Sequence, residues 1–311
     1  MKKDNGINYE LRILSECEIL YLNCRERITN QPVSSNMSSF TITSSDGKEL
    51  FAKEWPEEKP KAVIALVHGL GEHISRYEHM ATFFNSHGIA VIGFDHRGHG
   101  KTVGRLGHIP GFEIMMDDVD ALIKVCKEKY PEKPVFLYGH SMGACLVLNH
   151  TLKRKPEIKA TIASAPPIIL DNKPSAIIIG LGKLMRNVLP SFTQPNGLNV
   201  NHISKDPEEV AKYVKDPLVH NKVSASLGMD LLDAGEWLDN YKGTSPLPLL
   251  IMHGAADQIT SAASSENFAE KMGNKTTFKK WDGLYHEIHN EPEQQQVFEF
   301  IFNWINDQLK G

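Results

Sequence analysis

Short apolar segments that alternate with helical stretches dominate the chain from residue 40 onward. Five of them are apolar on both faces, namely KAVIALVHG, GIAVIGFDHRG, PVFLYGHS, TIASAP and LPLLIMHG. The segment TTFKKW is predicted to be a sixth strand. Helical patterns lie between several of them, at 77–86, 112–129 and 142–153. Strands that are apolar on both faces are typical of a parallel sheet covered by helices on both sides. The sequence therefore predicts an α/β fold with a mostly parallel central sheet flanked by helices.

Three further segments define the predicted domain organisation. The sequence FTITSSDGKELFAKEW predicts two strands joined by a turn at Asp46-Gly47. Residues 168–243 interrupt the alternation and look mostly helical, which predicts a cap or lid inserted between core strands. Residues 1–38 form an N-terminal extension, with a short helix at 11–22 and a polar linker after it. We thus expect a 39–311 domain with a cap insertion at about 168–243.

Composition narrows the class of protein. The chain has 311 residues, 41% hydrophobic and 23% charged, with a net charge of -4, which is typical of a globular protein and argues against a nucleic-acid partner. Its four cysteines have no metal-ligand spacing, so we expect free thiols and no metal. Acidic residues interrupt the N-terminal apolar stretch, and no apolar run is long enough to span a membrane. These features predict a cytoplasmic protein.

A Gly-x-Ser-x-Gly motif follows the apolar segment VFLY and precedes a helical pattern. It consists of residues 139–143 and places Ser141 at its centre. This motif between a strand and a helix is typical of the nucleophile elbow of α/β-hydrolases. Glycines two positions before and after the serine remove the Cβ atoms that a tight turn cannot accommodate. We therefore predict that Ser141 is a nucleophile and that a helix begins at Met142.

Acyl transfer also needs two backbone N–H donors for the oxyanion. One is expected from Met142, the residue after the nucleophile, and the other from the loop after an early strand. The strand AVIALV ends in His68-Gly69-Leu70, which places Leu70 in that position.

A histidine base and an acid must complete the site. In this fold the chain order is serine, acid, histidine, which puts the base near the C-terminus. His286 follows the loop directly after the last predicted strand, and His289 lies one helical turn farther on. Asp257 follows LPLLIMHG and is the expected acid, although an aspartate there also suits a helix N-cap. Asp282 is a weaker candidate because it lies only four residues before His286.

Five motifs follow one another along the chain: HGLGEHISRY, FDHRGHGKT, GHSMGA, HGAADQIT and GLYHEIHNEP. With these motifs in this order, the chain resembles the monoacylglycerol lipase family, a lysophospholipase-like group of serine hydrolases. The resemblance covers roughly residues 40 to 308. It implies an α/β-hydrolase fold, a triad of Ser141, Asp257 and His286, and oxyanion donors at Leu70 and Met142. Relatives often have a smaller residue where Leu70 stands.

The same resemblance implies a substrate and its binding residues. Glu72, Arg76 and His289 match polar residues at the glycerol end of the family's pocket, and the cap is expected to contact membranes. The implied reaction is hydrolysis of monoacylglycerol to glycerol and fatty acid, without metal or organic cofactor. A lysophospholipase, a general carboxylesterase and a non-catalytic ligand-binding protein remain alternatives. The apolar cap segment 175–185 suits either a helix on a bilayer or a buried cap helix.

Overall fold

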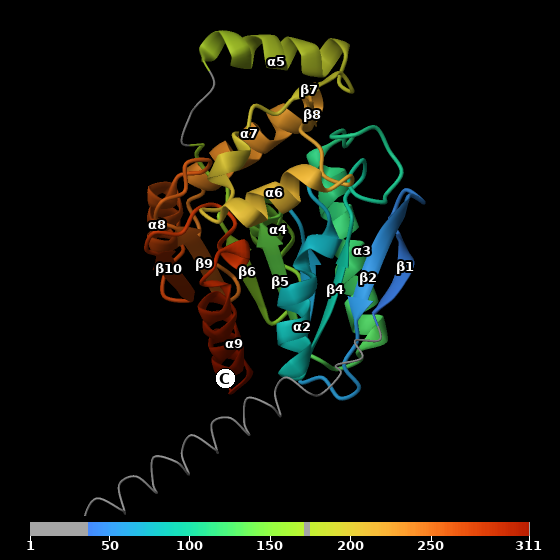
Figure 1. Cartoon of the computed structure of the whole chain (residues 1–311), viewed down its shortest axis with the longest axis vertical. Coiled ribbons are helices and arrows are strands. Elements are labelled where there is room, and N and C mark those ends of the chain that lie inside the picture. The colour runs from blue at the N-terminus through green and yellow to red at the C-terminus, as the bar shows by residue number, and fades with distance from the viewer. Residues whose placement is uncertain (1–36, 171–174, 311) are drawn as a thin grey trace, which may run out of the picture. The chain divides into compact units, whose positions relative to one another are not determined.

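The computed structural model describes residues 37–170 and 175–310. Its centre is an eight-stranded sheet with the order β1-β2-β4-β3-β5-β6-β9-β10 (Figure 1). The β1–β2 and β2–β4 pairs are antiparallel, and all other neighbours are parallel. The predicted fold class is thereby confirmed. The strands are β1 (Ser38–Thr43), β2 (Glu49–Trp55), β3 (Ala62–Val67), β4 (Ile89–Phe94), β5 (Val135–His140), β6 (Ala160–Ser164), β9 (Leu249–Gly254) and β10 (Thr276–Trp281).

Helices cover both faces of this sheet. One face packs against α2 (Glu78–Ser86) and α9 (Gln294–Lys310), and the other against α3 (Phe112–Lys129), α4 (Met142–Arg154) and α8 (Ala262–Lys271). Alternate residues of β3 contribute to the two cores, since Ile64 and Leu66 face the first and Val63 and Ala65 the second. Burial on both faces explains why the parallel strands are apolar at almost every position.

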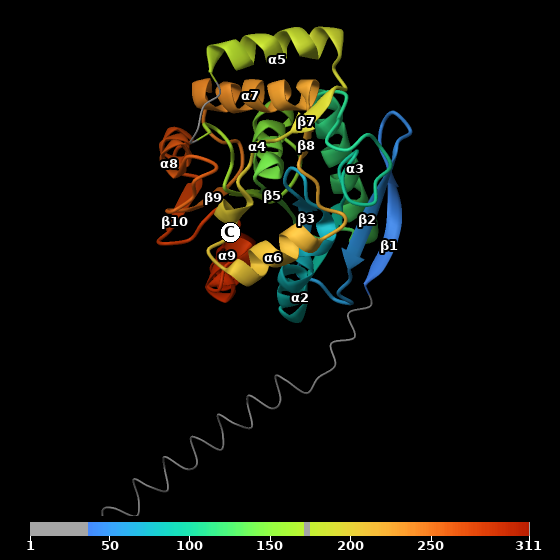
Figure 2. The same cartoon turned by 45° about the horizontal axis from the view of Figure 1, so that its top comes forward.

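The segment predicted to form a cap lies between β6 and β9, and we refer to it as the cap. Its helices are α5 (Ala176–Val188), α6 (Pro207–Lys215) and α7 (Ala225–Asn240), with a 3-10 turn η2 (Val200–His202). A small antiparallel sheet of β7 (Thr193–Pro195) and β8 (Lys222–Ser224) also lies in the cap, and the helical pattern in the sequence did not predict it. Figure 2 shows α5 beyond α7, on the side away from the sheet.

The N-terminal extension lies almost wholly outside the described residues. This includes its predicted helix at 11–22 and the two cysteines Cys17 and Cys24. Strand β1 begins at Ser38, the last residue assigned to the extension. The other two cysteines, Cys126 and Cys145, are buried free thiols.

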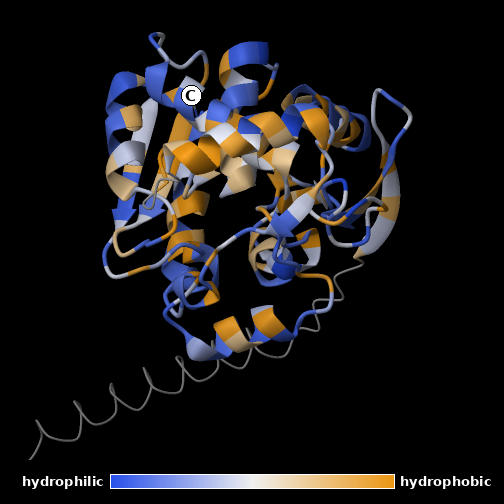
Figure 3. Cartoon of the chain, turned by 90° about the horizontal axis from the view of Figure 1, so that it is seen from above, coloured by the Kyte–Doolittle hydropathy of each residue, from blue (hydrophilic) through white to orange (hydrophobic). Residues whose placement is uncertain are grey.

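Hydrophobic residues gather at the centre of the molecule, on the strands and on the helix sides that face them (Figure 3). Two 3-10 turns adjoin the edge of the sheet where the parallel strands end, η1 (Ile74–Tyr77) and η3 (Ile288–Asn290). Catalytic and binding side chains are expected at this carboxyl edge of the sheet.

In the described part of the chain, no helix combines the length and the apolar composition that crossing a bilayer requires.

Candidate active site

Ser141 occupies a strained turn between strand β5 and helix α4. Its backbone angles are φ 51° and ψ -118°, a conformation that a residue with a side chain rarely adopts. Such a conformation costs of order 1–3 kcal/mol and persists only where the surroundings enforce it. The Ser141 amide donates to the carbonyl of Ser164 on β6 over 2.9 Å, and α4 begins at Met142 as predicted. The turn therefore presents the Ser141 side chain at the end of the sheet.

Two glycines make this turn possible. A Cβ atom on Gly139 would collide with the carbonyl of Gly143 across the turn. A Cβ atom on Gly143 would collide with the carbonyls of Val67 and His68 at the end of β3. Close packing of backbone on backbone, rather than flexibility, is thus the reason for glycine at both positions.

Ser141, His286 and Asp257 form a hydrogen-bonded chain. The Nε2 atom of His286 lies 2.9 Å from Oγ of Ser141, and its Nδ1 atom lies 2.7 Å from Oδ2 of Asp257. Since a carboxylate only accepts, Nδ1 carries the proton and Nε2 is free to accept the serine proton. The structure therefore brings together the three side chains selected from the sequence, and Asp282 is exposed. This arrangement can deprotonate a serine hydroxyl.

Asp257 is held by several donors. Its Oδ1 accepts from the amides of Ile259 and Thr260, at 2.7 and 3.1 Å, and its Oδ2 accepts from the Thr260 hydroxyl at 2.8 Å. The alternative that Asp257 caps a helix is wrong, because Ser261 is the N-cap of α8. Asp257 instead lies within the loop between β9 and α8, and its side chain is fully buried.

Asp257 and His286 shift each other's pKa. Burial on its own would raise the pKa of Asp257, but the charge of His286 and hydrogen bonds from His253 and His286 hold that pKa far below its usual range. Burial on its own would lower the pKa of His286, but the charge and hydrogen bond of Asp257 outweigh it and raise that pKa above the ordinary histidine value. The site therefore stabilises the imidazolium that proton transfer from serine creates.

The loop that carries Leu70 lies directly beside the nucleophile. A Cβ atom on Gly69 would be 3.2 Å from Cβ of Ser141. The amide of Gly69 donates to Oε1 of Glu72 over 2.6 Å, which fixes the loop. Within residues 37–170 and 175–310, the Leu70 and Met142 amides donate to no other residue. Both predicted oxyanion donors are thus available next to Ser141, and their role remains a prediction.

Glu72 and Arg76 belong to a buried ion cluster. Nη1 of Arg76 donates to Oε2 of Glu72 over 2.8 Å, and both Nη atoms donate to Glu287, over 2.8 and 2.6 Å. Tyr77 donates to Oε1 of Glu72 over 2.7 Å. Burial would raise the pKa of Glu287, but the charge and hydrogen bonds of Arg76 lower it to about 2, whereas burial raises the pKa of Glu72. The polar groups predicted to bind substrate are therefore largely bonded to one another.

His289 differs from these residues. It is fully buried, stacks on the Tyr77 ring at 4.8 Å between centroids, and lies 4.6 Å from the ring of His140. In the described part of the chain, neither ring nitrogen of His289 has a hydrogen-bond partner. Burial lowers the pKa of His289 well below its usual value, so the ring is neutral. His289 is thus the member of the predicted binding set with unused hydrogen-bonding capacity.

Some groups around the site were missed in the sequence. Glu287 directly follows His286, and its amide donates to the carbonyl of Ile203 in the cap over 2.7 Å. Glu291, also buried, accepts from the Tyr285 amide and from the Ser204 hydroxyl, at 2.7 and 2.8 Å. The only sequence signal was the density of acidic residues around His286, since partners so distant in the chain become apparent only in the fold.

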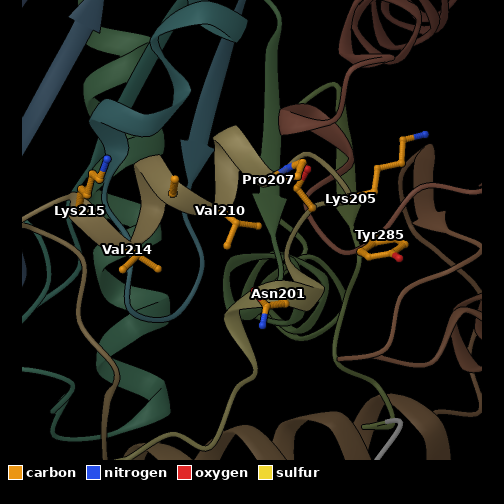
Figure 4. Close-up of a pocket in the computed structure, with 9 residues that line it drawn as sticks. Asn201, Lys205, Pro207, Val210, Val214, Lys215 and Tyr285 are labelled. Atoms are coloured by element: carbon orange, nitrogen blue, oxygen red, sulfur yellow. The ribbon is translucent and has the colours of Figure 1, made fainter.

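A pocket of about 450 Å³ lies between the cap and the residue that precedes His286. Figure 4 shows Val210 and Val214 of α6 on one side of it and Tyr285 on the other. Ser141 is not among its lining residues. This pocket therefore adjoins the histidine loop and is separate from the nucleophile.

Comparison with known proteins gives consistent matches. The model of the serine aminopeptidase S33 family matches residues 58–293. A monoacylglycerol lipase of Mycolicibacterium smegmatis is 31% identical over 280 residues, which cover 89% of this chain and 100% of that protein. An uncharacterized abhydrolase domain-containing protein of Dictyostelium discoideum is 35% identical over 274 residues, 87% of this chain, which spans only 29% of that protein.

The fold comparison agrees. The crystal structure of a monoacylglycerol lipase of Paleococcus ferrophilus superposes with a TM-score of 0.78 and 30% identity, over 84% of this chain and 99% of that one. Sequence and fold therefore match over most of the chain. The chain is a serine ester hydrolase that belongs to the monoacylglycerol lipase family of α/β-hydrolases, within the serine aminopeptidase S33 group.

Proposed function

We propose that this protein hydrolyses monoacylglycerol to glycerol and a free fatty acid, with Ser141, His286 and Asp257 as its catalytic triad. The observation that carries the proposal is the 2.9 Å contact between Nε2 of His286 and Oγ of Ser141 at a strained elbow. Relatives named monoacylglycerol lipases, similar over nearly the whole domain, support the substrate class.

The acylation step follows from the geometry. Oγ of Ser141 attacks the ester carbonyl while Nε2 of His286 takes its proton, and Asp257 stabilises the resulting imidazolium. The amides of Leu70 and Met142 donate to the oxyanion. His286 then gives its proton to the departing glycerol oxygen as the C–O bond breaks, which leaves the acyl group on Ser141.

Deacylation repeats the sequence with water. His286 removes a proton from a water molecule, whose oxygen attacks the acyl carbonyl. The second oxyanion uses the same two amides, and its collapse releases the fatty acid as His286 returns the proton to Oγ of Ser141.

The polar end of the site would receive glycerol. His289, with two unused ring nitrogens among the described residues, is the group proposed to bond a glycerol hydroxyl directly. Glu72 and Arg76 are proposed to form the charged wall behind it, since their hydrogen bonds to Glu287 and Tyr77 hold them in place.

A substrate panel tests the proposal. Purified protein should hydrolyse monoacylglycerols with higher kcat/KM than lysophosphatidylcholine or short p-nitrophenyl esters, and Ser141→Ala should lose that activity while keeping its unfolding midpoint. A preference for lysophosphatidylcholine would favour a lysophospholipase, and a preference for short esters a general carboxylesterase. Near-normal hydrolysis by Ser141→Ala would refute the assigned nucleophile.

Helix α5 of the cap is proposed to rest on a lipid surface. Ile177, Leu181, Leu184 and Val188 recur at helical spacing and are 84%, 58%, 58% and 63% exposed. The alternative of a buried cap helix is wrong, because no residue of α5 is buried. Its opposite side is attached to α7, where Arg186 donates to Asp233 over 2.6 Å. An apolar face of this kind is typical of a helix that lies in a membrane interface.

Vesicle binding tests this part of the proposal. The double variant Leu181→Glu/Leu184→Glu should bind phosphatidylcholine vesicles at least tenfold more weakly, because it places two charges on the apolar face. Gln295→Glu, at an exposed position of α9, is the control and should bind like the wild type. Equal vesicle binding by the double variant and the control would exclude α5 as the docking element.

A further inference from the structure

A second histidine contacts the carboxylate of Asp257. His253 lies on strand β9, four residues before Asp257, and is fully buried. Its Nε2 atom is 2.9 Å from Oδ2 of Asp257, the same oxygen that His286 contacts at 2.7 Å. The proposed mechanism assigns no role to this residue.

The surroundings of His253 determine which nitrogen carries the proton. Its Nε2 atom lies 2.9 Å from Oδ2 of Asp257 and 3.2 Å from the carbonyl oxygen of Thr260, both of which can only accept. It is also 3.1 Å from the hydroxyl oxygen of Thr260, whose own hydrogen is donated to Asp257. A lone pair on Nε2 would be repelled by all of these oxygens, so Nε2 must carry the hydrogen. Nδ1 lies 2.9 Å from Oγ of Ser265 on α8 and accepts its hydroxyl proton. The contact with Ser265 therefore orients the ring so that Nε2 of His253 donates to Asp257.

This donor completes a full shell around the carboxylate. Oδ2 accepts from His286, His253 and the Thr260 hydroxyl, and Oδ1 accepts from the amides of Ile259 and Thr260. The side chain of Asp257 has no solvent exposure, so only these donors orient it. Loss of one donor would allow the carboxylate to rotate and would concentrate its charge on the remaining partners.

We propose that His253 is a positioning residue that, held by Ser265, keeps Oδ2 of Asp257 directed at His286 and shares the negative charge of that oxygen. The proposal rests on the triad assigned above. It predicts that His253 acts only through Asp257, because its ring reaches the carboxylate and not Ser141. A second donor to Oδ2 competes with His286 for the charge of Asp257, so its removal should make His286 more basic.

The interpretation of the pH–rate profile depends on which titratable groups lie around His286. Asp257, Glu287 and Glu72 favour its protonated form, and the ring of His140 lies 4.9 Å away. Burial lowers the pKa of His140 to about 3, so that ring stays neutral above pH 5. The acidic limb of the reaction rate above pH 5 therefore reports on His286.

The test measures the rate of covalent labelling by a fluorophosphonate as a function of pH. His253→Leu, which packs but cannot donate, should label roughly 10- to 100-fold more slowly, with an acidic limb shifted to higher pH. His253→Gln carries a donor N–H and an acceptor carbonyl in one side chain and should restore both the rate and the limb. The control is His150→Leu, which alters a buried histidine that bonds Asp120 from helix α4 and should leave labelling unchanged.

Three results would overturn the proposal. A wild-type labelling rate and pH profile in His253→Leu would exclude a role for His253. A slower rate with an unshifted profile that glutamine does not rescue would indicate packing alone. Absence of labelling in the wild-type protein would refute the triad itself, and the inference with it. If His253→Leu does not fold, Ser265→Ala replaces it and should shift the limb in the same direction.

Discussion

The guanidinium of Arg76 donates two hydrogen bonds, 2.6 and 2.8 Å long, to the carboxylate of Glu287, the residue that directly follows His286. A third bond joins Arg76 to Glu72, whose other oxygen holds the amide of Gly69 beside Ser141. One buried cation thus connects the histidine loop to the loop of the predicted oxyanion donors. Arg76 thus supplies a charged link between these two loops, beside the stack of Tyr77 on His289.

Arg76→Gln should therefore destabilise the protein strongly. It leaves two buried carboxylates without their counter-charge, a loss that typically costs about 3–5 kcal/mol. Urea unfolding followed by circular dichroism measures the change. Arg186→Gln is the matched control, because Arg186 is 32% exposed and its partners Asp230 and Asp233 both remain partly exposed, so its loss should cost about 1 kcal/mol or less. Similar losses in both variants would contradict the importance of the buried cluster.

Gly143→Ala should be similarly damaging at the elbow. The added methyl group would collide with the backbone carbonyls of Val67 and His68, which cannot move without displacing β3. We expect a loss of at least about 2 kcal/mol and a large fall in ester hydrolysis. Gly180→Ala in α5, where an added Cβ meets open space, should instead stabilise by up to about 1 kcal/mol. An unfolding midpoint for Gly143→Ala equal to that of the wild type would contradict the described elbow.

The free energy of unfolding should begin to decrease with falling pH at values above those at which carboxylates titrate. Burial lowers the pKa of His96 to about 4 and of His140 to about 3, so both are neutral in the folded protein. The unfolded chain binds these protons near pH 6.5, so their contribution is complete above that pH and decreases as pH falls toward the folded values. Each histidine contributes a slope of about 1.4 kcal/mol per pH unit in that window.

The measurement is the free energy of unfolding in urea between pH 7 and pH 5. His96→Asn removes one titrating group and should reduce the slope by about 1.4 kcal/mol per pH unit. A free energy that is constant over this range would show that the buried imidazoles do not contribute.

The sequence predicted the fold class well because its strands are short and apolar on both faces. Because each of these strands is buried between two helical layers, apolar residues occupy both of its faces, as Ile64 and Val63 illustrate by facing opposite cores. The elbow was predictable for a related reason, since its turn demands glycine at fixed positions around Ser141. Local steric requirements of this kind are encoded within a few residues.

Contacts between distant segments were not predictable in the same way. The strands β7 and β8 are each three residues long and carry no apolar alternation. The bonds of Glu287 and Glu291 to the cap join residues more than 80 positions apart, which no local pattern records. Exposure of the apolar face of α5 was equally hidden, because periodicity shows that a face is apolar and not what covers it.

Mass spectrometry of the protein after reaction with a fluorophosphonate probe tests whether Ser141 is the nucleophile that His286 activates. We expect one adduct per chain, on the peptide that contains Ser141, and we expect His286→Ala and Ser141→Ala each to abolish labelling. Labelling at another residue, or undiminished labelling of His286→Ala, would contradict this assignment.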